Sequence, residues 1–455
     1  MSLARYREYK DSGFDWLGMV PAHWHIKRLR YVANLNPSKS ELAAYNRSTE
    51  VSFLPMEAIG DDGSLNLDRT RTIAEVENGY TYFRDGDVTL AKITPCFENG
   101  KGALMQGLRE GIGFGTTELI VARPNSSEVL GSMLNWIFRS PNFRKQGEAS
   151  MYGAGGQKRV PDDFVRDFAG ALPPIDEQVA IAAFLERETA KIDMLIAEQE
   201  KLIALLAEKR EATISHAVTK GLNRNAPMKD SGIAWLGEIP SHWTTARLRH
   251  LTTQIVDGAH FTPTYVDEGV PFLRVTDITG KFPNLDNVKR IPESEHRELC
   301  QRCRPQKGDL LLSKNGTIGV PKIITWDWEF SIFVSLCLLK MTPEMSASFA
   351  AYVFESSSIK IQIDEGAKQS TVTNLHLEKI GAFRFPVPPV REQEVIVAHL
   401  CTETAKFDAL SAEAERTICL LKERHSALIT AAVTGQIDVR GTVVQEEEAH
   451  EAIAA

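Results

Sequence analysis

The chain has few cysteines, no long apolar run and no excess of positive charge. Its 455 residues include six cysteines, at positions 96, 300, 303, 337, 401 and 419, which are too few and too scattered for a disulfide scaffold. The longest nearly apolar run, residues 330–339, is much shorter than the roughly 18 residues of a membrane-spanning helix. The N-terminal residues are charged and show no apolar secretory segment. We therefore expect a cytoplasmic protein with reduced thiols and no membrane partner.

The net charge of −8, from 52 basic and 60 acidic residues, at first argues against a nucleic-acid partner. The acidic excess is unevenly placed, however. Residues 25–172 hold 18 basic and 18 acidic side chains, and residues 244–389 hold 17 and 16. These two regions are therefore close to neutral. A neutral domain lacks the field of a non-specific DNA binder, so recognition would have to come from individual contacts.

Motifs of common active sites are also missing. The sequence contains no GxxxxGK[ST] phosphate loop, no HExxH, no GxSxG and no NPP[FY] of an amino-methylating enzyme. Cys300 and Cys303 form one CxxC pair with His296 nearby, but no second cluster supplies a further zinc ligand. We therefore predict no catalytic residue and no metal site.

The sequence instead contains an internal repeat. Residues 10–30 and 229–249 are identical at 13 of 21 positions, and both contain DSG-x-x-WLG followed by P-x-HW. A second pair follows in the same order, PPIDEQ at residues 173–178 and PPVREQ at residues 388–393. Two repeats of about 220 residues are too few and too long for a solenoid, so we infer a duplicated domain plus helix with pseudo-two-fold symmetry.

Each PP-x-x-EQ motif opens a long helical pattern. Apolar residues recur at heptad spacing on both segments, the other faces are charged, and no Gly or Pro interrupts about 40 residues. We expect the helices to pack on each other as a coiled coil, although a helix buried within a larger domain would give a similar pattern. The predicted seam residues are Leu185, Ile192, Leu195, Leu202, Leu206, Leu400, Phe407, Leu410, Leu421 and Leu428.

The remaining regions alternate short apolar runs with Gly, Asp and Asn turns, which is typical of mixed α+β domains. The expected organisation is an N-terminal motif (1–32), a first domain (33–172), a helix (173–221), a linker with the repeated motif (222–251), a second domain (252–387), a second helix (388–437) and an acidic, disordered tail (438–455).

Polar and basic loops recur at matching places in the two domains. Lys and Arg suit phosphates and guanine edges, while amide and hydroxyl side chains suit adenine edges and backbone oxygens. A solvated surface loop is the alternative for any one of them. The predicted DNA contacts are Lys92, Thr94, Asn99, Lys101, Gln157, Lys158 and Arg159 in the first domain, and His260, Thr262, Lys314, Asn315, Thr317, Lys368, Gln369, Ser370 and Thr371 in the second.

The order of these motifs resembles the DNA-specificity subunit of type I restriction-modification systems over nearly the whole chain. The resemblance implies an α+β fold with two tandem α/β target-recognition domains, each followed by a long helix, and an antiparallel coiled coil between the helices that acts as a ruler. It also implies that each domain reads half of a split, asymmetric site in double-stranded DNA. The chain itself would be non-catalytic and hold no cofactor.

The same resemblance assigns the chemistry to partners. Two methyltransferase subunits would dock on the helices and hold S-adenosylmethionine for adenine-N6 methylation. Restriction and translocase subunits would use ATP and Mg. Two alternatives stay open, namely a stand-alone DNA-binding or regulatory protein of this architecture, and an enzyme with an unrecognised nuclease or methylase site. The repeated Trp16/Trp235, Trp24/Trp243 and His23/His242 pairs are interpreted as structural anchors or as part of a docking surface.

Overall fold

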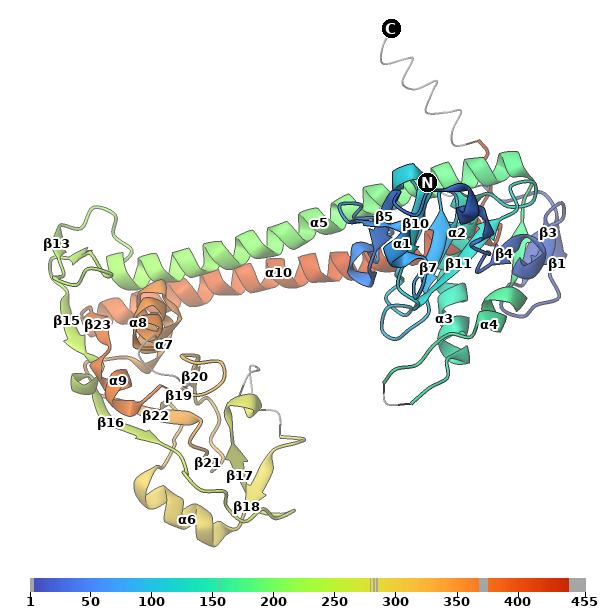
Figure 1. The fold of residues 1–455 in the computed structure, drawn as a ribbon. Helices are drawn as coiled ribbons and strands as arrows, with labels where there is room; N and C mark the ends of the chain where they lie inside the picture. The colour runs from blue at the N-terminus through green and yellow to red at the C-terminus, as the bar shows by residue number, and fades with distance from the viewer. Residues whose placement is uncertain are drawn as a thin grey trace. The chain divides into compact units, whose positions relative to one another are not determined.

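The computed structural model describes residues 4–154, 156–278, 280, 283, 285–367 and 375–441. The chain divides into a first unit, Met1–Glu198 with Thr417–Ala455, and a second unit, Gln199–Arg416. Two long helices, α5 (Ile175–Lys220) and α10 (Val390–Val433), are seen in Figure 1, and each contributes one part to each unit. The predicted contacts at positions 368–371 and the tail from residue 442 onward lie outside the described residues.

The described strands of the first unit form two four-stranded sheets, ordered β6-β5-β10-β7 and β4-β11-β8-β9, and two short ribbons, β1-β2 and β12-β3. Their bounds are β1 Tyr9–Asp11, β2 Met19–Pro21, β3 His25–Arg28, β4 Ala33–Leu35, β5 Glu50–Leu54, β6 Thr70–Thr72, β7 Thr81–Arg84, β8 Val88–Ala91, β9 Gly102–Leu104, β10 Ile112–Gly115, β11 Leu119–Pro124 and β12 Ala169–Leu172. The short helices are α1 Ile73–Val76, α2 Gly131–Arg139, α3 Pro141–Ser150 and α4 Asp162–Asp167.

The second unit repeats this plan with sheets ordered β16-β22-β19-β20 and β18-β17-β21, and ribbons β13-β14 and β15-β23. Its strands are β13 Met228–Asp230, β14 Glu238–Pro240, β15 Thr244–Arg247, β16 Thr252–Asp257, β17 Val270–Leu273, β18 Lys289–Ile291, β19 Leu310–Ser313, β20 Pro321–Ile323, β21 Ser331–Ile332, β22 Leu336–Met341 and β23 Arg384–Val387. Its short helices are α6 Glu293–Arg302, α7 Ala347–Glu355, α8 Ser357–Ala367 and α9 Leu377–Ala382.

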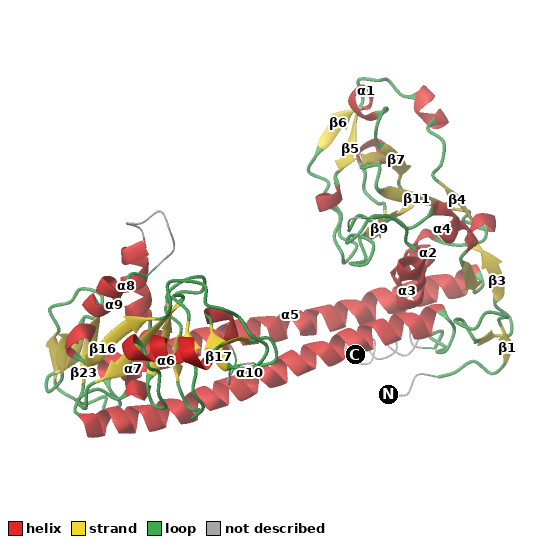
Figure 2. Cartoon of the chain, turned by 90° about the horizontal axis from the view of Figure 1, so that it is seen from below, coloured by secondary structure: helices red, strands yellow, loops and turns green. Residues whose placement is uncertain are grey.

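The two units match strand for strand in their main sheets. In both, the first strand after the repeated motif pairs with a long central strand. That central strand pairs in turn with β8 or β19, which lie in the matching segments GDVTLAK (residues 86–92) and GDLLLSK (residues 308–314). Each unit also has one parallel pair, β10 with β5 and β21 with β17. Figure 2 shows the strands gathered in the two domains, while α5 and α10 are continuous helices. The duplicated α+β fold expected from the sequence is confirmed.

The long helices begin where proline allows and pack through apolar stripes. Pro173-Pro174 and Pro388-Pro389 come directly before α5 and α10, at the helix entry where a missing N–H costs nothing. In the first unit the start of α5 and the end of α10 share one core, through Leu185 and Ile429 among others. In the second unit the end of α5 and the start of α10 do the same, through Ile214 and Leu400. The two helices are therefore antiparallel, as the resemblance implied.

The predicted seam is too wide. Leu185, Ile192, Leu206, Leu400 and Phe407 are buried, and Leu421 and Leu428 are half-buried. By contrast, Leu195, Leu202 and Leu410 have exposed fractions of 51%, 41% and 54%, so their assignment to the seam is wrong. Two packed helices bury only a narrow stripe, and apolar residues beside that stripe remain on the surface.

Candidate nucleic-acid interface

A glutamine near the start of each long helix holds the domain that precedes that helix in the chain. Gln178 Nε2 donates to the carbonyl oxygens of Pro173, at 2.9 Å, and Glu128, at 3.0 Å, and its Oε1 accepts from Leu130 N, the N-cap of α2. Gln393 repeats this pattern in the second unit with Pro388, Glu344 and Ser346, the N-cap of α7. The Gln of PP-x-x-EQ therefore orients each domain on its helix.

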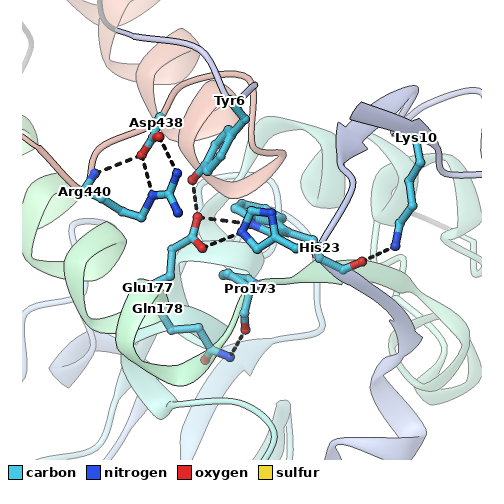
Figure 3. A network of polar contacts seen from close by, with 9 residues as sticks. Tyr6, Lys10, His23, Pro173, Glu177, Gln178, Asp438 and Arg440 are labelled. Carbon is cyan, nitrogen blue, oxygen red and sulfur yellow. Dashed lines mark hydrogen bonds and ion pairs between the residues drawn. The ribbon is translucent and has the colours of Figure 1, made fainter. Parts of the chain in front are cut away.

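Glu177, the residue before Gln178, contacts the tryptophan and the histidine of the repeated motif. Glu177 is buried and accepts from Trp24 Nε1 at 3.1 Å and from the Tyr6 hydroxyl, and His23 Nε2 lies 2.8 Å from its second oxygen (Figure 3). Burial and the neighbouring carboxylate raise the pKa of Tyr6. Figure 3 also shows Arg440 beside this group, and its guanidinium lies 5.0 Å from the Tyr6 ring. Tyr6 therefore contacts both α5, through Glu177, and Arg440 near the other end of the described chain.

The second unit has the same motif with fewer hydrogen bonds to its glutamate. His242 Nε2 lies 2.8 Å from Glu392 Oε2, but Trp243 Nε1 is buried without a hydrogen-bond partner among the described residues. The ends of the helices match as well. Gly221 and Gly435 adopt φ values of +73° and +72°, which favour glycine, and each lies against the tryptophan of the motif.

In the first unit the structure brings two predicted DNA-binding loops together. Thr94 N donates to Lys158 O at 3.0 Å, Val160 N donates to Lys92 O at 2.8 Å, and Ile93 forms a bridge with Arg159. The loop after β8 and the loop before α4 therefore form one surface. Of the predicted contacts on it, Asn99, Gln157 and Lys158 are exposed and Lys92 is half-buried.

Several polar groups of this surface are already engaged within the protein. The Arg159 guanidinium donates to both oxygens of Glu118 at 2.8 and 2.9 Å. Lys101 Nζ donates to two main-chain carbonyl oxygens, and the Thr94 hydroxyl donates to Glu98. Lys101 and Thr94 thus shape the loop, whereas part of the Arg159 side chain remains exposed.

A buried arginine that sequence reasoning missed holds the same loop. Arg144 of α3 donates to the carbonyl oxygens of Phe97, Gly100 and Phe138 at 2.5 to 2.8 Å. Burial lowers the pKa of Arg144 to about 10. No sequence motif marks this residue, because two of its three partners, the carbonyl groups of Phe97 and Gly100, lie 47 and 44 residues away in the chain.

In the second unit the buried carboxylate of Asp257 contacts basic side chains from three places in the chain. Asp257, at the end of β16, accepts from Lys314 Nζ at 2.7 Å and from Arg302 Nη2 at 2.6 Å, and His260 Nε2 lies 3.0 Å away. Burial alone raises the pKa of Asp257, but these three donors outweigh it and hold the pKa at about 2.

The prediction that Lys314 contacts DNA is wrong. Its side chain is 5% exposed and its ammonium group faces Asp257 inside the protein instead of solvent. Asn315 also has a buried side-chain oxygen without a described partner, whereas His260, Thr262 and Thr317 are exposed. Arg302, which the sequence analysis did not select, has a 55% exposed side chain at this junction.

Within the CxxC pair, Cys303 has the properties of a core cysteine and Cys300 is half-buried. Cys303 is buried, and burial raises the pKa of its thiol to about 12. His296 is buried and its Nδ1 lies 2.9 Å from Ser331 Oγ. Across the described residues, no group of three or more His, Cys, Asp or Glu side chains is arranged to hold a metal. None of the described helices is both long and apolar enough to cross a membrane.

Comparison with known proteins finds similarity to DNA-specificity subunits. The family model described as type I restriction modification DNA specificity domain matches residues 261–416. The specificity subunit of the type I restriction enzyme EcoAI from Escherichia coli is 40% identical over 193 residues, 42% of this chain and 32% of that protein. The EcoEI specificity subunit, also from Escherichia coli, is 39% identical over 193 residues, again 42% of this chain and 32% of that protein. The chain thus spans about a third of the length of these relatives.

Two solved structures share the fold. A chain solved in a study of complex assembly and conformational transition of the type I R-M system has a TM-score of 0.74 at 19% identity, covering 91% of this chain and 98% of that one. The HsdS subunit from Thermoanaerobacter tengcongensis has a TM-score of 0.56 at 18% identity, with 94% and 100% covered. At these identities the likeness establishes the fold alone.

Proposed function

We propose that the chain is a type I restriction-modification DNA-specificity subunit and that it selects the DNA sequence on which such a complex acts. Each unit would bind one half of a split, asymmetric site in double-stranded DNA. The chain would be non-catalytic and direct adenine-N6 methylation and restriction by partner subunits. The DNA substrate would place it in the cytoplasm.

The observation that carries this proposal is the duplicated domain with dissimilar polar loops. Both units anchor the domain on its helix through the same Gln contacts, so the scaffold is repeated. The loops on that scaffold differ, since Lys92 is half-buried where its counterpart Lys314 is buried on Asp257. A repeated scaffold with different contact groups suits a DNA site whose two halves differ in sequence.

Exposed leucines at equivalent positions support docking of two copies of one partner. Leu195 and Leu410 correspond in the two repeats and are 51% and 54% exposed. Leu205 and Leu420 also correspond and are 53% and 56% exposed. Repeated apolar side chains on the outer side of both helices would bind two methyltransferase subunits in equivalent ways. S-adenosylmethionine, ATP and Mg would be held by the methyltransferase and the restriction and translocase partners.

Adenine methylation tests the proposal. The full chain, mixed with a methyltransferase subunit and S-adenosylmethionine, is expected to give N6-methyladenine only within one split motif, which sequencing of modified bases identifies. Methyltransferase alone is the control and is expected to give no motif. Sequence-selective DNA binding without methylation would instead favour a stand-alone DNA-binding protein, and methylation or cleavage by the chain alone would indicate an enzyme.

A further inference from the structure

Arg302 is held along one edge of its guanidinium. Nη2 donates to Asp257 Oδ1 at 2.6 Å, and Nη1 lies 3.4 Å from the carbonyl oxygen of Gly258. The side chain is nevertheless 55% exposed, while the Asp257 side chain is 4% exposed. A guanidinium fixed in this way keeps further N–H groups for a ligand and loses little rotamer freedom on binding.

Two cations share the single negative charge of Asp257 at this junction, Arg302 and Lys314. The buried Lys314 ammonium also faces Asp257, at 2.7 Å, and balances its single negative charge. Asp257 can therefore orient Arg302 while Lys314 supplies the neutralising charge. Lys314 has a supporting role, which explains why a lysine at the expected contact position is buried.

A hollow beside Arg302 presents both hydrogen-bond donors and acceptors. It has a volume of about 370 Å³ and is lined by Arg302, His260, Phe261 and Glu298, among others. Phe261 is 56% exposed and Glu298 is exposed. A phosphate offers only acceptors and is repelled by a carboxylate. The edge of a base offers acceptors to Arg302, and its pair partner can offer an amino group to Glu298.

We propose that Arg302, oriented by Asp257, reads a guanine in the half-site bound by the second unit. The guanidinium donates to O6 and N7 in the major groove, and Glu298 accepts from the amino group of the paired cytosine. This inference rests on the proposed DNA-binding function. It names one residue that determines specificity in the second unit, which sequence reasoning did not select.

Selection from a randomised duplex library tests the assignment. The full chain is expected to enrich a split motif, and Arg302→Ala is expected to lose the preference for one guanine in one half by roughly tenfold or more, with the other half unchanged. Arg302→Lys keeps the charge and is expected to retain binding but lose the same guanine preference. Replacing that guanine with 7-deazaguanine, which removes N7, is expected to weaken binding by the unchanged protein.

The controls separate the possible failures. Arg297 lies on the same helix and pairs with Glu293, so Arg297→Ala is expected to keep the full motif. If Arg302→Ala weakens all sequences equally and lowers the salt dependence by about one unit of slope, Arg302 contacts a phosphate and the proposal is overturned. If the wild-type chain selects a motif that Arg302→Ala and Arg302→Lys retain, only this inference fails. If the wild-type chain selects no motif, the proposed function fails with it.

Discussion

At the scale of single residues, the two anchoring glutamates offer a matched comparison. Glu177 is 3% exposed and satisfies Trp24 Nε1 and the Tyr6 hydroxyl, whereas the Glu392 side chain is 29% exposed and Trp243 Nε1 has no described partner to lose. Glu177→Ala should therefore lower the free energy of unfolding by about 2 kcal/mol or more, since it leaves two buried donors unsatisfied. Glu392→Ala should cost about 1 kcal/mol or less. Urea unfolding midpoints measure both, and equal shifts would contradict the role assigned to Glu177.

Asp257 predicts an acid-sensitive contribution to stability. Its pKa in the folded protein, about 2, lies below the unfolded value of about 3.9, so the ionised form favours folding. This contribution is complete above about pH 4 and is lost as the pH falls toward 2. The difference in urea midpoint between the wild type and Asp257→Asn should therefore be constant from pH 7 to 5 and shrink below pH 4. A difference that stays unchanged down to pH 3 would argue against the Lys314 and Arg302 contacts.

The candidate site was only partly predictable at this scale. The sequence predicted where loops occur, because turn residues and strand patterns mark them. It could not separate an exposed lysine from a buried one. Whether Lys314 faces solvent or Asp257 depends on two segments 57 residues apart in the chain. Arg144 and Arg302 were missed for the same reason, since their partners come from other loops.

At the scale of elements, variants of two adjacent leucines on α5 can distinguish helix packing from partner binding. Leu206 is 8% exposed and Leu205 is 53% exposed. Leu206→Asp places a charge in the seam and should destabilise the protein by several kcal/mol. Leu205→Asp should leave the unfolding midpoint nearly unchanged but reduce co-purification of a methyltransferase subunit at least tenfold. A stable Leu206→Asp variant would contradict the seam, and full partner binding by Leu205→Asp would contradict the docking surface.

The helices themselves were the most predictable elements. Heptad spacing over about 40 residues, with proline before each segment, leaves little alternative to a long amphipathic helix. The pattern did not give the width of the seam, because Leu195 and Leu410 satisfy a heptad count yet remain exposed. Hydrophobic spacing identifies the side of a helix that is apolar, and only the packing partner decides how much of that side is covered.

At the scale of the whole molecule, the duplication visible in the sequence determined most of the architecture. Each unit also has its own apolar cores. The described clusters around Trp24 and Phe83 belong to the first unit, and those around Trp243 and Phe272 belong to the second. Separate cores allow the loops of one domain to change without repacking the other, which fits recognition of two unrelated half-sites.

Separate cores predict that contacts in the two units act independently. Lys158 and His260 are exposed predicted contacts in different units. Each single change to Ala should weaken binding of the selected duplex several-fold, and Lys158→Ala should affect only the half read by the first unit. Effects at sites that share no partners add within about 0.3–0.5 kcal/mol, so the double variant should show the product of the two losses within about twofold. Fluorescence anisotropy of full-length protein on one duplex, with a variant of each half-site as control, measures this. If the double variant binds the duplex as tightly as the weaker-binding single variant, both residues serve one contact. That outcome would contradict two units that read DNA independently.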